Sequence, residues 1–155
     1  MRIYLIGSLR NPAVPLLAQK IRGLGHEVFD DWFAAGPEAD DYWQKYEMAR
    51  DHSYIEALEG FAANHVFEYD RTHLEGCDAA VLLLPAGKSG HMEFGYALGQ
   101  GKKGYIVLSQ PTQENVATRW DVMYRFATKV YENEQGLLYD LYRGTVQMAT
   151  YRGER

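Results

Sequence analysis

The apolar run AAVLLL, residues 79–84, constrains the fold of this chain more than any other feature. Six apolar residues without a polar alternation are typical of a strand that is buried on both faces, as in the centre of a parallel sheet. A second apolar run, IYLIG at residues 3–7, predicts another buried strand that ends at a glycine turn. We therefore expect these two strands to form the middle of one parallel sheet.

The rest of the chain alternates between helical and strand patterns. Asn11 and Pro12 begin a helix that Gly25 ends, and the later segments follow in the order HEVFDDW (strand), GHMEFGYALGQG (helix), YIVLS (strand), RWDVMYRFA (helix), TKVYEN (strand) and NEQGLLYDLYR (helix). This alternation predicts an α/β fold in a single domain over residues 1–155. Its five-stranded parallel sheet is expected to have the order 2-1-3-4-5, with helices on both faces.

Between the second strand and AAVLLL, the segment from Ala34 to about Glu68 has helical spacing but no strand pattern. We interpret it as an insertion of short helices. Such an insertion either covers a ligand pocket or forms a solvated outer layer, and the sequence leaves both alternatives open.

Charge and composition exclude several classes of function. Sixteen basic and twenty-one acidic residues give a net charge of −5 without a Lys/Arg block, which argues against a nucleic acid polymer and favours a small molecule. Cys77 is the only cysteine, so neither an internal disulfide nor a thiolate metal cluster is expected. The histidines have no metal-ligand spacing, and we predict no metal and no organic cofactor. With no apolar run long enough for a bilayer and no signal-peptide pattern, we expect a cytoplasmic protein without membrane contact.

Ligands of open parallel sheets bind beyond the carboxyl ends of the strands, where the strand order reverses. Two glycine-containing loops are expected to meet there, at residues 7–10 and 85–91. Both lead into helices, whose free N–H groups favour an anion or a polar oxygen. Neither loop has the spacing of a P-loop or of a dinucleotide-binding motif. The candidate binding residues of these loops are Gly7, Ser8, Arg10, Gly87, Ser89 and Gly90.

Two acids stand near the same edge of the expected sheet. Glu93 falls in the first turn of its expected helix, where an acid either caps the backbone or, kept ionised by the helix start, serves as a nucleophile. Asp70 lies one connection before the central strand, and Asp78 directly precedes that strand and is typical of a turn residue. Enzymes that break glycosidic bonds commonly use a pair of carboxyl groups.

Four features follow one another along the chain: IYLIGSLRNP, Asp70 with Asp78, PAGKSGHMEFGYALGQGKK and RWDVMY. In this order they resemble the nucleoside 2-deoxyribosyltransferase family over essentially the whole chain. The resemblance implies a flavodoxin-like sheet and cleavage of the N-glycosidic bond of a 2'-deoxynucleoside, with transfer of the sugar to another free nucleobase. It further implies that Glu93 becomes covalently attached to the deoxyribose and that Asp70 contacts and protonates the departing base.

The resemblance also implies further contacts with the substrate. Tyr4 and Gly7 match positions that line the sugar and base pocket. Asp121, with Met123 two residues later in WDVM, resembles a position at which a neighbouring subunit offers an amide to the 5'-hydroxyl of the sugar. This implies a homo-oligomer with shared active sites. An Asp there still accepts a hydrogen bond from a hydroxyl but repels a 5'-phosphate.

The chain departs from the transferase pattern at Gly87, where transferases often have a further acid, and this implies a different recognition of the base. GSLR favours an alternative within the same family, because it resembles the first turn of a sister group that hydrolyses 2'-deoxynucleoside 5'-monophosphates, whereas Asp121 opposes a phosphate. In that group Arg10 would pair with the phosphate, with Ser8, Lys88, Ser89 and His91 as nearby donors. A third alternative is a nucleotide-binding domain without catalysis, in which Glu93 only caps a helix. Transfer of the deoxyribosyl group is our first expectation, and the monophosphate hydrolase is the second.

Overall fold

The computed structural model describes residues 1–108 and 120–152. At its centre lies a five-stranded sheet with the order β2-β1-β3-β4-β5, in which all neighbouring strands are parallel. The predicted strand order and direction are therefore confirmed, and the apolar run AAVLLL supplies the central strand. The strands are β1 (Arg2–Ile6), β2 (Glu27–Phe29), β3 (Ala79–Leu83), β4 (Lys103–Val107) and β5 (Lys129–Tyr131).

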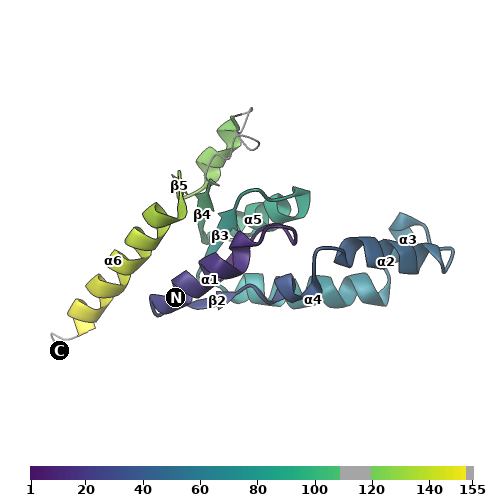
Figure 1. The fold of residues 1–155 in the computed structure, drawn as a ribbon, viewed down its shortest axis with the longest axis horizontal. Coiled ribbons are helices and arrows are strands. Elements are labelled where there is room, and N and C mark those ends of the chain that lie inside the picture. Colours follow the sequence, from purple (N-terminus) through teal and green to yellow (C-terminus); the bar gives the residue numbers. More distant parts are fainter. Residues whose placement is uncertain (109–119, 153–155) are drawn as a thin grey trace.

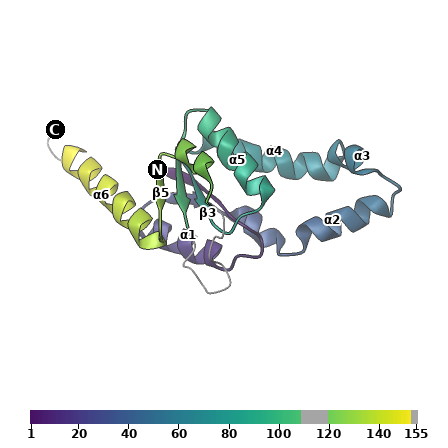
Figure 2. The same cartoon turned by 90° about the horizontal axis from the view of Figure 1, so that it is seen from above.

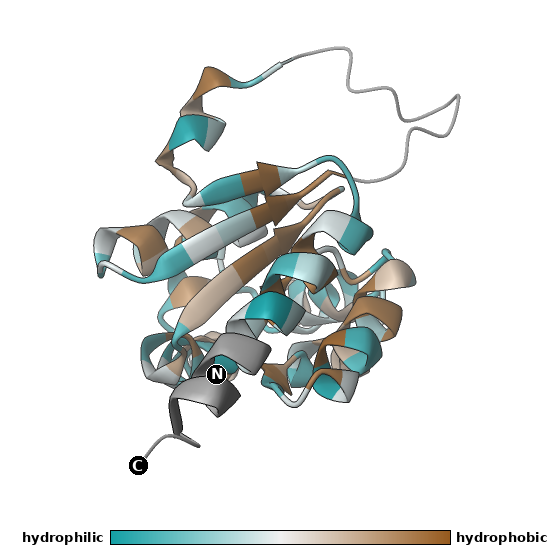
Figure 3. Ribbon diagram, turned by 90° about the vertical axis from the view of Figure 1, so that its left-hand side faces the viewer, coloured by the Kyte–Doolittle hydropathy of each residue, from teal (hydrophilic) through white to brown (hydrophobic). Residues whose placement is uncertain are grey.

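Helices cover both faces of the sheet (Figure 1). They are α1 (Ala13–Gly23), α2 (Ala39–Met48), α3 (Tyr54–Leu58), α4 (Phe61–Gly76), α5 (Lys88–Gly99) and α6 (Glu134–Arg152), with 3-10 helices η1 (Asp31–Ala35) and η2 (Val122–Phe126). In Figure 3 the hydrophobic colour runs along the central strands toward their arrowheads, while the helices carry hydrophilic stretches as well. None of the helices in the described ranges combines the length and apolar character needed to cross a membrane.

The two faces of the sheet have separate hydrophobic cores because side chains alternate along each strand. Ile3 and Leu5 of β1 pack with α1 and α6, whereas Tyr4 and Ile6 pack with residues of α4 and α5. The alternation thus places the Tyr4 side chain on the face that α4 and α5 cover.

The insertion before β3 projects from the body of the molecule. In Figures 1 and 2, α2, α3 and the first part of α4 extend away from the sheet, and we call residues 39–68 the arm. Short helices were predicted here and are found, but α4 is longer than expected and continues to Gly76. Of the two alternatives for this segment, the structure favours the outer layer over a cover for the strand ends.

Several element boundaries differ from the prediction. Helix α5 begins at Lys88 and not at Gly90, and α6 continues to Arg152. Within RWDVMYRFA the described residues form only the short η2. The predicted strand YIVLS begins earlier, at Lys103, and its last residue, Ser109, lies outside the described residues.

Gly90 is needed where α5 approaches β1. A Cβ atom at this position would lie 2.9 Å from Ile6 Cγ2, which is too close without a shift of the helix or of Ile6. We expect Gly90→Ala to lower the free energy of unfolding by about 1–3 kcal/mol through overpacking. The matched control is Gly95→Ala in the same helix, where a Cβ meets nothing within 4 Å and should raise stability by about 0.5–1 kcal/mol. Urea unfolding of both variants measures the difference, and equal stabilities would contradict this account of Gly90.

Candidate active site

Glu93 projects from α5 toward the sheet. The buried residues of this helix are Gly90, Phe94 and Ala97, and Glu93 lies three residues after the first and four before the last, on the same face. Its side chain is half-buried. Because Gly87 is the N-cap and α5 starts at Lys88, Glu93 lies in the second turn, and no acid stands in the first turn. The prediction of a first-turn acid is therefore wrong, and with it the interpretation of Glu93 as a capping residue.

Asp70 reaches the same region from α4. It is half-buried and lies four residues before Leu74, which packs in the core under this helix. Helix α4 contacts both β1 and α5. The negative charge of Asp70 raises the pKa of Glu93, so the two carboxyl groups are close enough to interact electrostatically.

Tyr4 lies on β1, on the face of the sheet that α4 and α5 cover. Its side chain is fully buried, and its hydroxyl has no hydrogen-bond partner among residues 1–108 and 120–152. Burial raises the pKa of Tyr4, and the charges of Glu93 and Asp70 raise it further. Tyr4 therefore keeps its proton and offers an unused donor beside two carboxyl groups.

The environment of the pair favours the protonated acids. Burial, with a smaller contribution from the negative charge of Asp70, raises the pKa of Glu93 to about 7. Burial also raises the pKa of Asp70, and His73 opposes this effect. The expectation that the helix start keeps Glu93 ionised is thus wrong, because the residue lies beyond the first turn in a poorly solvated position. The two groups titrate as a coupled pair, and Glu93 is only about half ionised near neutral pH.

The first loop is tightly packed and connects to the arm. A Cβ atom on Gly7 would lie 2.6 Å from Val14 Cγ2, so this glycine permits the close approach of α1. Ser8 Oγ accepts a hydrogen bond of 3.1 Å from the backbone N–H of Arg10. The Arg10 guanidinium forms an exposed ion pair of 3.3 Å with Asp41 at the start of the arm.

The second loop is tied to η2. Gly87, Lys88 and Ser89 are exposed at the start of α5. His91 lies with Nδ1 2.8 Å from the carbonyl oxygen of Gly87 and Nε2 3.0 Å from the Tyr124 hydroxyl. The contact between His91 and Tyr124 was not predicted, because nothing in the sequence relates the two segments.

Two other acids have structural partners. Asp121 caps η2 by accepting a hydrogen bond of 2.8 Å from the N–H of Met123, and both side chains are exposed. Asp78 accepts a hydrogen bond of 2.7 Å from the N–H of Arg2 at the amino end of β3. The interpretation of Asp78 as a turn residue is therefore confirmed.

An aromatic cluster of Phe29, Tyr69 and His73 near Asp70 was not predicted from the sequence. Phe29 lies opposite Tyr4 in the register of β1 and β2, and their ring centroids are 5.0 Å apart. The His73 ring stacks on Phe29 with centroids 3.9 Å apart, and Tyr69 lies 5.6 Å from Phe29. Tyr69 and His73 flank Asp70 in EYDRTH, which is the one signal that the sequence offered.

A cavity of about 540 Å³ opens beside the first loop, on the side of α1 and α6. Its lining includes Ser8, Arg10, Asn11, Lys20, Pro85 and Asn133 but neither of the two acids. The carboxyl pair instead lies between the other face of the sheet and the helices α4 and α5. The cavity lies at the carboxyl ends of β1, β3 and β4, where the crevice was predicted, and the two acids are not among its lining residues.

No family model matches the chain, and no curated protein does. Solved structures do match. A 2-deoxyribosyltransferase from Bacillus psychrosaccharolyticus is 17% identical, with a TM-score of 0.58 over 89% of this chain and 90% of its own. The CMP N-glycosidase BcmB of Clostridium botulinum is 15% identical, with a TM-score of 0.53 over 91% of this chain and 98% of its own. The resemblance that the motifs carry thus extends to the fold: this chain has the parallel α/β fold of a 2-deoxyribosyltransferase and of an N-glycosidase.

Proposed function

We propose that this protein cleaves the N-glycosidic bond of a nucleoside or nucleotide, with Glu93 as the nucleophile. The observation that carries the proposal is the electrostatic interaction of two half-buried acids, Glu93 and Asp70, with each other and with Tyr4, whose hydroxyl has no partner within residues 1–108 and 120–152. The fold supports it, since the two similar structures are named for 2-deoxyribosyl transfer and for N-glycosidic cleavage of CMP. No step of this reaction needs a metal or an organic cofactor.

The reaction proceeds in two displacements. The Glu93 carboxylate attacks the anomeric carbon, the bond from carbon to nitrogen breaks, and its electron pair leaves with the base. Asp70 gives its proton to that base as it departs. A second nucleobase then attacks the glycosyl ester, returns a proton to Asp70 and releases Glu93. Water in place of the second base gives hydrolysis.

The chemistry requires the proton on Asp70 and the charge on Glu93. The free pair favours protonation at Glu93, whose pKa is about 7. Positive charge that develops on the sugar in the transition state favours the Glu93 carboxylate. The Tyr4 hydroxyl can donate a hydrogen bond to the same carboxylate. It has no other hydrogen-bond partner in the described part of the chain.

We take transfer between a 2'-deoxynucleoside and a free nucleobase as the first form of this activity. Hydrolysis of a 2'-deoxynucleoside 5'-monophosphate is the second form, and Arg10 favours it. The Arg10 ion pair with Asp41 is exposed and therefore weak, so a phosphate can compete for the guanidinium. Ser8 of the same loop and the exposed Ser89 supply hydroxyl donors.

The proposal includes a homo-oligomer that shares its active sites. Two groups of exposed apolar side chains support it, because patches of this kind mark interaction surfaces. One follows the arm and α4, and the other surrounds Asp121. Their members are Tyr42, Tyr46, Tyr54, Ile55, Phe61 and Phe67 in the first group and Trp120, Val122, Met123 and Phe126 in the second.

Chromatography of reaction products tests the function. Wild type is incubated with each 2'-deoxynucleoside, its 5'-monophosphate and CMP, with and without a different free base. We expect an exchanged nucleoside, formed only when the second base is present. Base release from monophosphates regardless of the acceptor would assign the hydrolase. Turnover of none of these substrates would overturn the proposal, and an active monomer in light scattering would overturn the shared sites.

A further inference from the structure

The position of Asp70 depends on the rotation of α4 about its own axis. In the described part of the chain, Leu74 is the only residue of this 16-residue helix whose side chain is buried. Leu74 holds the helix near the sheet, and next to it Glu75 Oε1 accepts a hydrogen bond of 2.6 Å from the Tyr96 hydroxyl of α5. A further contact, on the side of α4 that faces β2, would complete the restraint on its rotation.

His73 makes such a contact. Its ring lies parallel to Phe29 of β2, with centroids 3.9 Å apart and an interplanar angle of 10°. The ring is held in place because Nδ1 lies 2.8 Å from the backbone oxygen of Tyr69. Phe29 in turn packs against Tyr4, with centroids 5.0 Å apart. A continuous series of rings therefore connects β1, β2 and α4.

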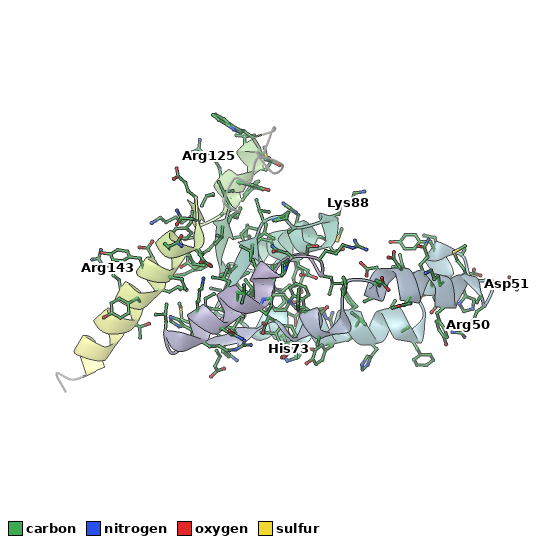
Figure 4. The ribbon with its side chains drawn as sticks, in the orientation of Figure 1. Arg50, Asp51, His73, Lys88, Arg125 and Arg143 are labelled. Atoms are coloured by element: carbon green, nitrogen blue, oxygen red, sulfur yellow. The ribbon has the colours of Figure 1, made fainter. Side chains whose placement is uncertain are left out.

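Asp70, His73 and Leu74 share one face of α4, because they are spaced by three and four residues. Figure 4 shows His73 where α4 passes the body of the molecule, whereas Arg50 and Asp51 mark the far end of the arm. With Leu74 in the core and His73 against Phe29, the direction of the Asp70 side chain is fixed as well.

We propose that His73 is a positioning residue for the carboxyl pair: its stack on Phe29 sets the rotation of α4 and so presents Asp70 to Glu93. The effect of His73 on the rate of cleavage rests on the proposed function, whereas its effect on the arrangement of Asp70 and Glu93 does not. The titratable groups that interact electrostatically with Asp70 are His73 on its own helix, Glu93 on α5 and Tyr4 on β1.

Two variants separate the ring from its charge. His73→Ala removes both, whereas His73→Phe keeps an aromatic ring for the stack and removes only the charge and the polar atoms. His65→Ala is the matched control, because His65 is an exposed histidine on the same helix. Phe29→Leu removes the other ring of the stack, and it replaces His73→Ala in the experiment if that variant does not fold.

The first readout is independent of catalysis. In protein labelled with ¹³C at the glutamate carboxyl groups, NMR follows the titration of Glu93. We expect the Glu93 midpoint to fall in His73→Ala, because the charge of Asp70 moves away, and to stay unchanged in His73→Phe and His65→Ala. An unchanged midpoint in His73→Ala, or an equal fall in His73→Phe, would overturn the proposal.

The second readout is the rate of glycosidic cleavage. We expect His73→Ala to lower kcat about 10- to 100-fold with a much smaller change in KM, because a misplaced catalytic group costs rate more than binding. His73→Phe should recover most of kcat. If wild type cleaves no substrate, the proposed function fails, but the NMR titration still decides whether His73 positions the pair.

Discussion

Replacing Glu93 by glutamine is expected to abolish glycosidic cleavage and, above pH 7, to make the protein more stable. The amide is nearly the same size as the carboxylate but cannot attack the anomeric carbon, so we expect kcat to fall at least about 10⁴-fold. The gain in stability has a separate cause, which is the position of Glu93 in a poorly solvated site beside Asp70.

The sign of the stability change follows from the proton. Glu93 has a pKa of about 7 in the folded protein against 4.5 as its ordinary value, so between these pH values the folded protein holds a proton that the unfolded chain releases. The stability of wild type therefore falls as pH rises through this window, by about 3 kcal/mol in total. Glutamine is neutral throughout. The two proteins should be equally stable at pH 4, and the variant should be more stable at pH 8.

Urea unfolding between pH 4 and pH 8 measures this difference, and product chromatography measures the loss of activity. Glu59→Gln is a suitable control, because Glu59 is exposed and its replacement should change neither property. Residual activity near the wild-type level in Glu93→Gln would exclude Glu93 as the nucleophile. A stability difference that does not depend on pH would exclude the raised pKa.

Replacing Asp70 by asparagine is expected to slow cleavage about 10²- to 10⁴-fold and to change the shape of the pH profile. In wild type, kcat/KM should be bell-shaped and fall above about pH 7, because the active form carries one proton on the coupled pair. Asparagine cannot donate that proton, so the alkaline limb should disappear. The remaining limb should report Glu93 alone, with a midpoint below 7, since the charge of Asp70 no longer raises its pKa.

Asp78→Asn is the matched control for this variant. Asp78 belongs to the same stretch of sequence, but its carboxylate accepts a hydrogen bond from the N–H of Arg2 at the amino end of the sheet. We expect it to leave the pH profile of kcat/KM unchanged. A bell-shaped profile that persists in Asp70→Asn would show that another group donates the proton.

The central sheet could be predicted because its signal is local. AAVLLL and IYLIG are apolar on both faces, and only the middle of a parallel sheet accommodates such strands. The start of α5 could not be predicted in this way. In the sequence Gly90 has the appearance of a turn residue, but it lies inside the helix. Glycine is needed at this helical position because the Ile6 side chain leaves no room for a Cβ atom. That requirement comes from β1, far away in the sequence.

The site was predicted unevenly for the same reason. Glu93 and Asp70 stand out as acids near the ends of recognisable elements, and the motifs around them resemble a known family. The protonation of Glu93 was predicted wrongly, because its pKa depends on burial and on the charge of Asp70 from another helix. The stack of His73 on Phe29 depends on the register of β2 beside β1, which no pattern within either segment specifies.

The arm and Asp70 belong to one continuous helix. Sixteen residues of α-helix measure about 24 Å, and α4 carries Phe61 at its outer end and Asp70 in its inner half. Helix α4 packs against α3 in the arm, while Leu74 and the His73 stack attach its inner half to the sheet. A change in the direction of this one helix would therefore move Asp70 and the arm together.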